Sequence, residues 1–79
     1  MQSIKVGKAL GANIRRKRKA QRLTQDQLSA RLQVLDCDLS RSTVAKIEVG
    51  IRHLSAKELQ SIKTVLDMSY EEFFENLDI

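Results

Sequence analysis

The chain of 79 residues has no proline or tryptophan, three glycines, one cysteine and one histidine. A single cysteine excludes an intramolecular disulfide, and one cysteine with one histidine cannot supply the ligands of a zinc finger. A chain of this length forms one small domain, with little room for an enclosed active site. No nucleophile placed beside a histidine, pair of acids or phosphate-binding glycine loop is present either. We therefore expect a single domain over residues 1–79 that is not an enzyme and binds no metal, cofactor or small molecule.

Long apolar segments are also missing. No run of apolar residues approaches the length of a membrane span, and the first ten residues, MQSIKVGKAL, lack the hydrophobic stretch of a signal peptide. The lone cysteine suits a reducing compartment. We therefore expect a cytoplasmic protein with no membrane partner.

The charge of the chain is divided unevenly. The net charge is +4, but residues 1–24 carry +8 and no acid, residues 25–53 are neutral, and the remainder carries −4. A basic surface attracts polyanions and an acidic surface repels them, so a nucleic acid should meet this molecule in one orientation. The alternative is that the basic run from Arg15 to Lys19 is only a solvated helix face.

The scarcity of glycine and the absence of proline predict an all-α domain. Thr24–Gln27, Ser55–Glu58 and Ser69–Glu72 have the capping-box form, in which a hydroxyl and a returning acid or amide bind free N–H groups at a helix start. Ser40 offers a fourth helix start, and Gly50 suits a helix end. Apolar residues at helical spacing agree with these limits. Five helices are expected, at about residues 5–20, 25–35, 41–49, 56–67 and 70–77.

The third of these helices has a composition suited to reading DNA. If Val44, Ile47 and Glu48 face the core, a polar and basic set points outward. Lys and Arg can donate to guanine, Ser can donate or accept, and apolar methyl groups can contact thymine. Two short helices beside a basic one can place the second in a major groove. The alternative is that these basic residues only improve solubility. The outward set is Arg41, Ser42, Ala45, Lys46 and Val49.

Three segments together resemble the phage Cro/repressor (XRE-type) helix-turn-helix family. Leu23–Leu28 (LTQDQL) and Ser40–Gly50 (SRSTVAKIEVG) match the two helices of the motif, and Leu66–Phe74 (LDMSYEEFF) resembles the closing helix pair. The resemblance covers most of residues 7–77. It implies a compact five-helix, lambda-repressor-like domain that acts as a sequence-specific transcription regulator, a homodimer on double-stranded DNA.

The resemblance also implies which residues contact DNA. Arg41, Ser42 and Lys46 match positions that usually read base edges. Thr43 matches a position that supports backbone or base contact. Gln25 matches a position that touches the DNA backbone through its amide and the amino terminus of its helix.

Two further implications concern residues near the end of the third helix. Arg52 matches a loop position that commonly binds phosphate. Arg18 and Glu48 match a recurrent ion pair that ties the first helix to the third. An acid held by Arg18 is neutralised, and the pair fixes the third helix in place.

The sequence departs from the family pattern at two places. The connection between the second and third helices is about four residues longer than the usual glycine turn. We expect one added helical turn that keeps Leu35 on the Leu28–Leu32 face, a loop at residues 36–38, and Leu39 directed inward. Lys17 stands where an apolar residue is usual, so the first helix is expected to pack less deeply or to extend this ammonium outward.

Four isolated residues leave two interpretations open. Cys37 could be a thiol switch, but its acidic neighbours disfavour the thiolate, which favours a plain loop residue. His53 could sense pH, or be an ordinary surface or phosphate-adjacent residue. Gly7 and Gly11 fall within the first helix, which they either weaken or allow to pack closely.

A second function, on the same fold, also fits the sequence. The domain could be a protein-interaction module, such as an antitoxin or adaptor, that binds its partner through the apolar and acidic carboxyl-terminal helix. Aromatic residues there are more often core or dimer contacts than partner hot spots. The apolar residues concerned are Tyr70, Phe73, Phe74, Leu77 and Ile79.

Overall fold

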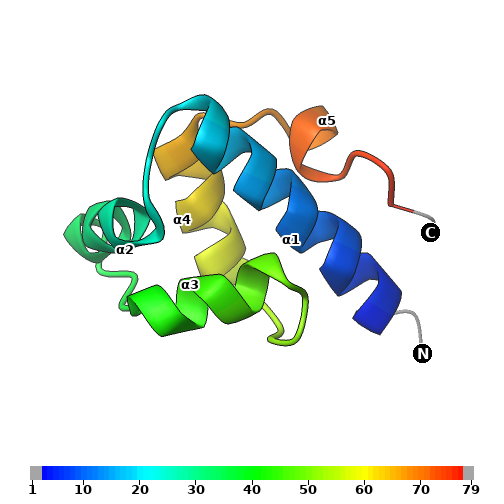
Figure 1. Cartoon of the computed structure of the whole chain (residues 1–79), viewed down its shortest axis with the longest axis horizontal. Coiled ribbons are helices and arrows are strands. Elements are labelled where there is room, and N and C mark those ends of the chain that lie inside the picture. The colour runs from blue at the N-terminus through cyan, green and yellow to red at the C-terminus, as the bar shows by residue number, and fades with distance from the viewer. Residues whose placement is uncertain (1–2, 78–79) are drawn as a thin grey trace.

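A computed structural model describes residues 3–77, which form five helices and no strand (Figure 1). The all-α prediction is confirmed. The first four predicted helices agree with the structure to within two residues at each end. The helices are α1 (Ser3–Ala20), α2 (Gln25–Val34), α3 (Arg41–Glu48), α4 (Ala56–Leu66) and α5 (Tyr70–Phe73).

Helix starts follow the capping signals of the sequence. Thr24, Ser55 and Ser69 each form both halves of a capping box, as predicted. The hydroxyl of Ser40 accepts a hydrogen bond from the backbone N–H of Thr43 at 3.2 Å. These side chains satisfy amides that would otherwise lack partners at the first turn, and so fix where each helix begins.

Helices α1 to α4 all end in the same way. A residue with positive φ follows the last turn, and the next backbone N–H reaches back to a carbonyl five positions earlier. This is the Schellman arrangement, which turns the chain back toward the helix it has just left. It directs Leu23, Cys37 and Met68 into the core after α1, α2 and α4. At these four helix ends the residues with positive φ are Arg22, Asp36, Gly50 and Asp67.

The connection between α2 and α3 differs from its prediction. Leu35 does not continue the Leu28–Leu32 face, because it caps the helix and its side chain is 40% exposed. Asp36, with φ of 59°, reverses the chain directly afterwards. Cys37 takes the inward position instead, and Leu39 is also buried, as predicted. The longer connection therefore ends α2 at Leu35 and then places two side chains, Cys37 and Leu39, in the core.

The last helix is shorter than predicted. It ends at Phe73 rather than at residue 77, because the side-chain amide of Asn13 on α1 donates to the carbonyl oxygens of Phe73 (2.9 Å) and Glu75 (2.6 Å). A longer helix would have bonded the first of these carbonyls to its own N–H group. Phe73 is fully buried, whereas Tyr70 and Phe74 are 57% and 41% exposed.

The helices enclose one core. In Figure 1, α1 crosses in front of α4, with α2 and α3 on one side of it and α5 on the other. Each helix contributes apolar side chains to the space between them. Within residues 3–77, no helix is long and apolar enough to cross a membrane. The core consists of Leu10, Ile14, Leu23, Leu28, Leu32, Cys37, Leu39, Val44, Ile47, Ile62, Leu66, Met68 and Phe73.

Close contact between α1 and the end of α3 depends on glycine. A Cβ added at Gly11 would meet the carbonyl oxygens of Ile47 and Glu48, the latter at 2.6 Å. A Cβ at Gly50, which has φ of 84°, would lie 2.7 Å from the Cα of Lys8. Gly11 therefore permits close packing, which the sequence left undecided.

Replacing this glycine should destabilise the domain. Gly11→Ala gains up to about 1 kcal/mol of helix propensity, but it forces α1 away from two backbone carbonyls, and overpacking of this kind costs about 1–3 kcal/mol. We expect a lower urea midpoint in circular dichroism. Gly7→Ala is the matched control, because its Cβ would lie 3.3 Å from the Gly50 carbonyl oxygen and needs only a small adjustment. Equal midpoints for the two variants would contradict this account of the crossing.

Candidate nucleic-acid interface

A buried ion pair joins α1 to α3. Arg18 donates from Nε to Glu48 Oε2 at 2.7 Å and from Nη2 to Glu48 Oε1 at 3.0 Å, and its Nη1 donates to the carbonyl oxygen of Leu23 at 2.7 Å. Both charged residues are about 5% exposed. Paired, planar contacts of this kind fix geometry as well as charge. The last turn of α3 is thus held against α1.

The first residue of α2 is joined to the same carboxylate. Gln25 Nε2 donates to Glu48 Oε1 at 3.1 Å. Glu48 therefore binds side chains from both preceding helices, and three helices meet at one carboxylate. This contact was not foreseen from the sequence, where Gln25 was considered only as a DNA ligand. Its side-chain amide is already engaged. In the first turn of α2 the hydroxyl of Thr24 binds the N–H of Gln27, whereas the N–H groups of Gln25 and Asp26 have no intrahelical partner.

The outer face of α3 carries the residues expected to read bases. Arg41, Ser42 and Lys46 are all exposed. Val49, 57% exposed, follows Lys46 at helical spacing, so an apolar side chain extends the polar row. Thr43 is half-buried, and its hydroxyl lies 3.0 Å from that of Ser40, which makes it part of the helix cap.

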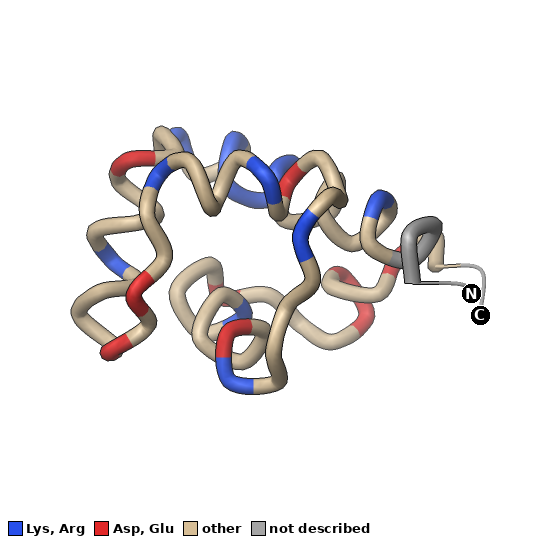
Figure 2. The backbone as a smooth tube through the Cα atoms, turned by 90° about the horizontal axis from the view of Figure 1, so that it is seen from below, with Lys and Arg blue, Asp and Glu red and all other residues tan. Residues whose placement is uncertain are grey.

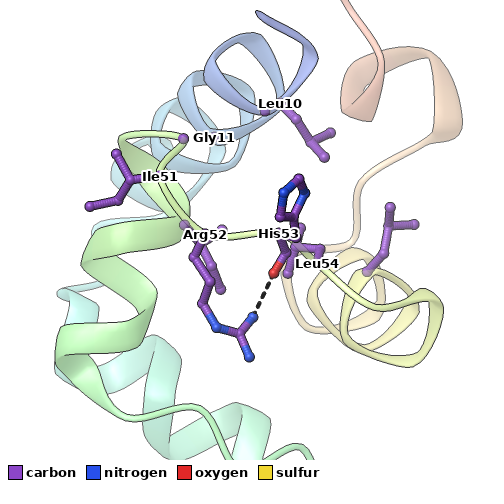
Figure 3. A pocket seen from close by; sticks show the side chains of 10 residues that line it. Leu10, Gly11, Ile51, Arg52, His53 and Leu54 are labelled. Carbon is purple, nitrogen blue, oxygen red and sulfur yellow. Dashed lines mark hydrogen bonds between the residues drawn. The ribbon is translucent and has the colours of Figure 1, made fainter. Parts of the chain in front are cut away.

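Arg52, expected to bind phosphate, is paired within the protein. Its Nη1 and Nη2 donate to the two carboxylate oxygens of Glu58 at 2.9 and 3.0 Å, and Nη1 also donates to the carbonyl oxygen of His53 (Figure 3). The side-chain hydrogen bond between Arg52 and Glu58 raises the pKa of Arg52 and lowers the pKa of Glu58. The capping position of Glu58 predicts its bond to the backbone N–H of Ser55, but gives no sign of its pairing with Arg52.

Acidic residues near the carboxyl terminus pair with the basic run of α1. Lys17 Nζ donates to Glu72 Oε2 at 2.9 Å, so the ammonium of Lys17 reaches outward to an acid. Hydrogen bonds from the backbone of Ser69 and from Lys17 lower the pKa of Glu72. Arg16 Nη1 lies 3.9 Å from Glu75 Oε1, and more than half of each of these two side chains is exposed. Two cations of the run are therefore balanced on the α5 side of α1.

A cavity of about 440 Å³ lies between α1, the end of α3 and the segment that follows it. Leu10, Leu54 and Leu59 give it an apolar lining, and the imidazole of His53 points toward Leu10 (Figure 3). Cys37 is buried away from it, in the core. Among the described residues, no group of three or more metal-ligating side chains is present.

The pair α2 and α3, with a side-chain hydrogen bond between them and a polar outer face on the second, defines a helix-turn-helix domain. The family model described as Helix-turn-helix matches residues 14–73, from the middle of α1 to the end of α5. The chain belongs to this family, of the Cro/repressor (XRE) type, whose members are DNA-binding regulators. No curated protein and no solved structure matched the sequence.

Removing the central carboxylate should destabilise the protein even without DNA. Glu48→Ala leaves the guanidinium of Arg18 buried without its acid, and breaking one side of a buried pair costs about 3–5 kcal/mol. Thermal melts followed by circular dichroism would measure the loss. Glu75→Ala is the control, because it removes an acid from a pair whose two side chains are both more than half exposed, and it should change the melt little. Gln25→Ala removes only one bond to Glu48 and should fall between the two. A melt of Glu48→Ala equal to that of Glu75→Ala would contradict the structural role.

Proposed function

We propose that this protein is a sequence-specific transcription regulator that binds double-stranded DNA with α3 in the major groove. Arg41, Ser42 and Lys46 contact base edges. The amino-terminal turn of α2, which begins at Gln25, contacts the phosphate backbone. Thr43 and Arg52 are assigned to the backbone as well.

The observation that carries this proposal is the three-helix junction at Glu48. Base reading needs a helix held at a fixed angle, because hydrogen bonds to base edges tolerate little displacement. The buried bonds of Arg18 and the half-buried bond of Gln25 to Glu48 provide that support from one face of α3. The opposite face is left exposed and carries two cations and a hydroxyl, Arg41, Lys46 and Ser42.

Arg52 is assigned a contact to the DNA backbone that is weakened by its pairing with Glu58. Its guanidinium keeps a bidentate bond to Glu58, and its side chain remains 35% exposed. A nearby carboxylate cancels much of the attraction of a guanidinium for phosphate. The loop after α3 therefore contributes hydrogen bonding and shape more than net charge.

We assign a homodimer to the working state, because one helix-turn-helix unit reads only a half-site. Tyr70 and Phe74 form a stacked pair with ring centroids 6.3 Å apart, and Lys63 Nζ lies 4.3 Å from the centre of the Tyr70 ring. Exposed aromatic groups are typical of association surfaces. The same pair is the observation that favours the second function, a module that binds a different protein.

Base selection from a random duplex pool tests the reading role. Lys46→Ala should relax preference at one or two positions by about 1–3 kcal/mol, since it removes a base contact. Gln25→Ala should weaken binding to all sequences alike, because it disturbs the support and backbone contact of the helices. If Lys46→Ala selects the same sequences as the unmodified protein, Lys46 does not read bases. If the unmodified protein binds selected and random duplexes equally at physiological salt, the regulator proposal fails.

The aromatic pair gives a separate test. Tyr70→Ser with Phe74→Ser should shift sedimentation toward the monomer and lower affinity for a two-half-site duplex, while leaving binding to a single half-site unchanged. Val34→Ser is the control, because Val34 is 82% exposed on α2, away from the pair. An unmodified protein that remains monomeric, both free and on a two-half-site duplex, would contradict the homodimer and favour a foreign partner.

A further inference from the structure

The structure divides the five consecutive cations of α1 into three that lie near an acid and two that have no acid partner among residues 7–77. Arg18 is buried against Glu48. Arg16 and Lys17 lie toward the acids that follow α4. Arg15 and Lys19 are exposed and have no ion-pair partner among residues 7–77. The family resemblance assigned an acid to Arg18 alone, whereas the acids that face Arg16 and Lys17 are brought near by tertiary contacts.

The exposed cations lie on one stripe of α1. Arg15 and Lys19 are one turn apart, and Lys8 precedes Arg15 by seven residues, so the three share a face. Arg22, also exposed, follows at the end of the helix. At 1.5 Å per residue, the stripe from Lys8 to Lys19 is about 16 Å long. The chain has no acid before Asp26, so nothing on this helix offsets the charge.

The stripe borders the side of α1 that meets α3. Gly11, which lies between Lys8 and Arg15 along the helix, faces the backbone at the end of α3. Helix α5, with its acids, packs on the other side of α1 (Figure 1). Figure 2, seen from the α3 side of the molecule, shows the Lys and Arg segments concentrated along one edge, the upper edge of the view.

We propose that Lys8, Arg15, Lys19 and Arg22 form a second phosphate-binding surface, which takes the DNA backbone just outside the half-site read by α3. This inference rests on the proposed function. One strand of B-DNA presents a phosphate about every 3.4 Å along the axis, so the length of the stripe corresponds to about five nucleotides. Cations that have no acid partner in the described part of the chain, at this spacing, fit a continuous polyanion and carry no base information. The surface extends the footprint without changing the sequence preference.

The proposal predicts that duplex length matters. We would compare a selected site without flanks to the same site with about ten added base pairs of unrelated sequence on each side. Arg15→Ala and Lys19→Ala should each weaken binding to the long duplex by about fivefold to tenfold at 100 mM salt, and lower the slope of affinity against salt by about one. Binding to the short duplex and the selected base preference should not change.

Lys57→Ala is the matched control. It also removes one exposed cation, at the start of α4, and should leave affinity for both duplexes unchanged. Circular dichroism melts of all three variants should match the unmodified protein, since each residue is exposed. If Arg15→Ala and Lys19→Ala behave like Lys57→Ala, the second surface does not exist. If they weaken short and long duplexes equally, the stripe does not bind flanking DNA. In both cases the proposed function stands if the unmodified protein prefers the selected site to a random duplex. If the unmodified protein shows no such preference, the proposed function itself fails.

Discussion

The carboxylate of Glu48 is the point on which the arrangement of the first three helices depends. A charged group that is removed from water is tolerated only when its oxygens are fully bonded, and here Arg18 and Gln25 together bond both oxygens. These bonds fix α1, α2 and α3 relative to one another. The same acid would repel a phosphate if it were exposed, so its burial also removes a negative charge from the face that α3 presents.

Two further contacts complete the frame around this junction. Gly11 lets α1 approach the backbone of α3 within van der Waals distance, which sets how far the guanidinium of Arg18 must reach. Asn13, two residues later on α1, binds the carbonyl groups that end α5. A single helix thus positions the DNA-reading unit on one side and the carboxyl-terminal acids on the other. The carboxyl-terminal acids are thereby kept on the side of α1 that lies away from α3.

Much of the fold could be predicted from the sequence because its signals are local. A hydroxyl at Ser55 and an acid at Glu58 bind each other's backbone amides, so the start of α4 depends on neighbouring residues alone. The end of α5 could not be predicted, because it depends on Asn13, sixty residues earlier in the chain. The conformation of Asp36 could not be predicted either, since Asp is enriched among left-handed residues but more often adopts other conformations.

The candidate site divides along the same line. Exposure of Arg41, Ser42 and Lys46 follows from helical periodicity, whereas the pairing of Arg52 with Glu58 and of Gln25 with Glu48 depends on tertiary contacts.

The left-handed residue that ends α1 links stability to DNA binding. Arg22 holds a left-handed conformation that costs a residue with a side chain about 1 kcal/mol. Glycine at that position would relieve the strain, but it would also remove a cation from the stripe on α1. At this one residue, thermal stability and attraction for DNA are opposed.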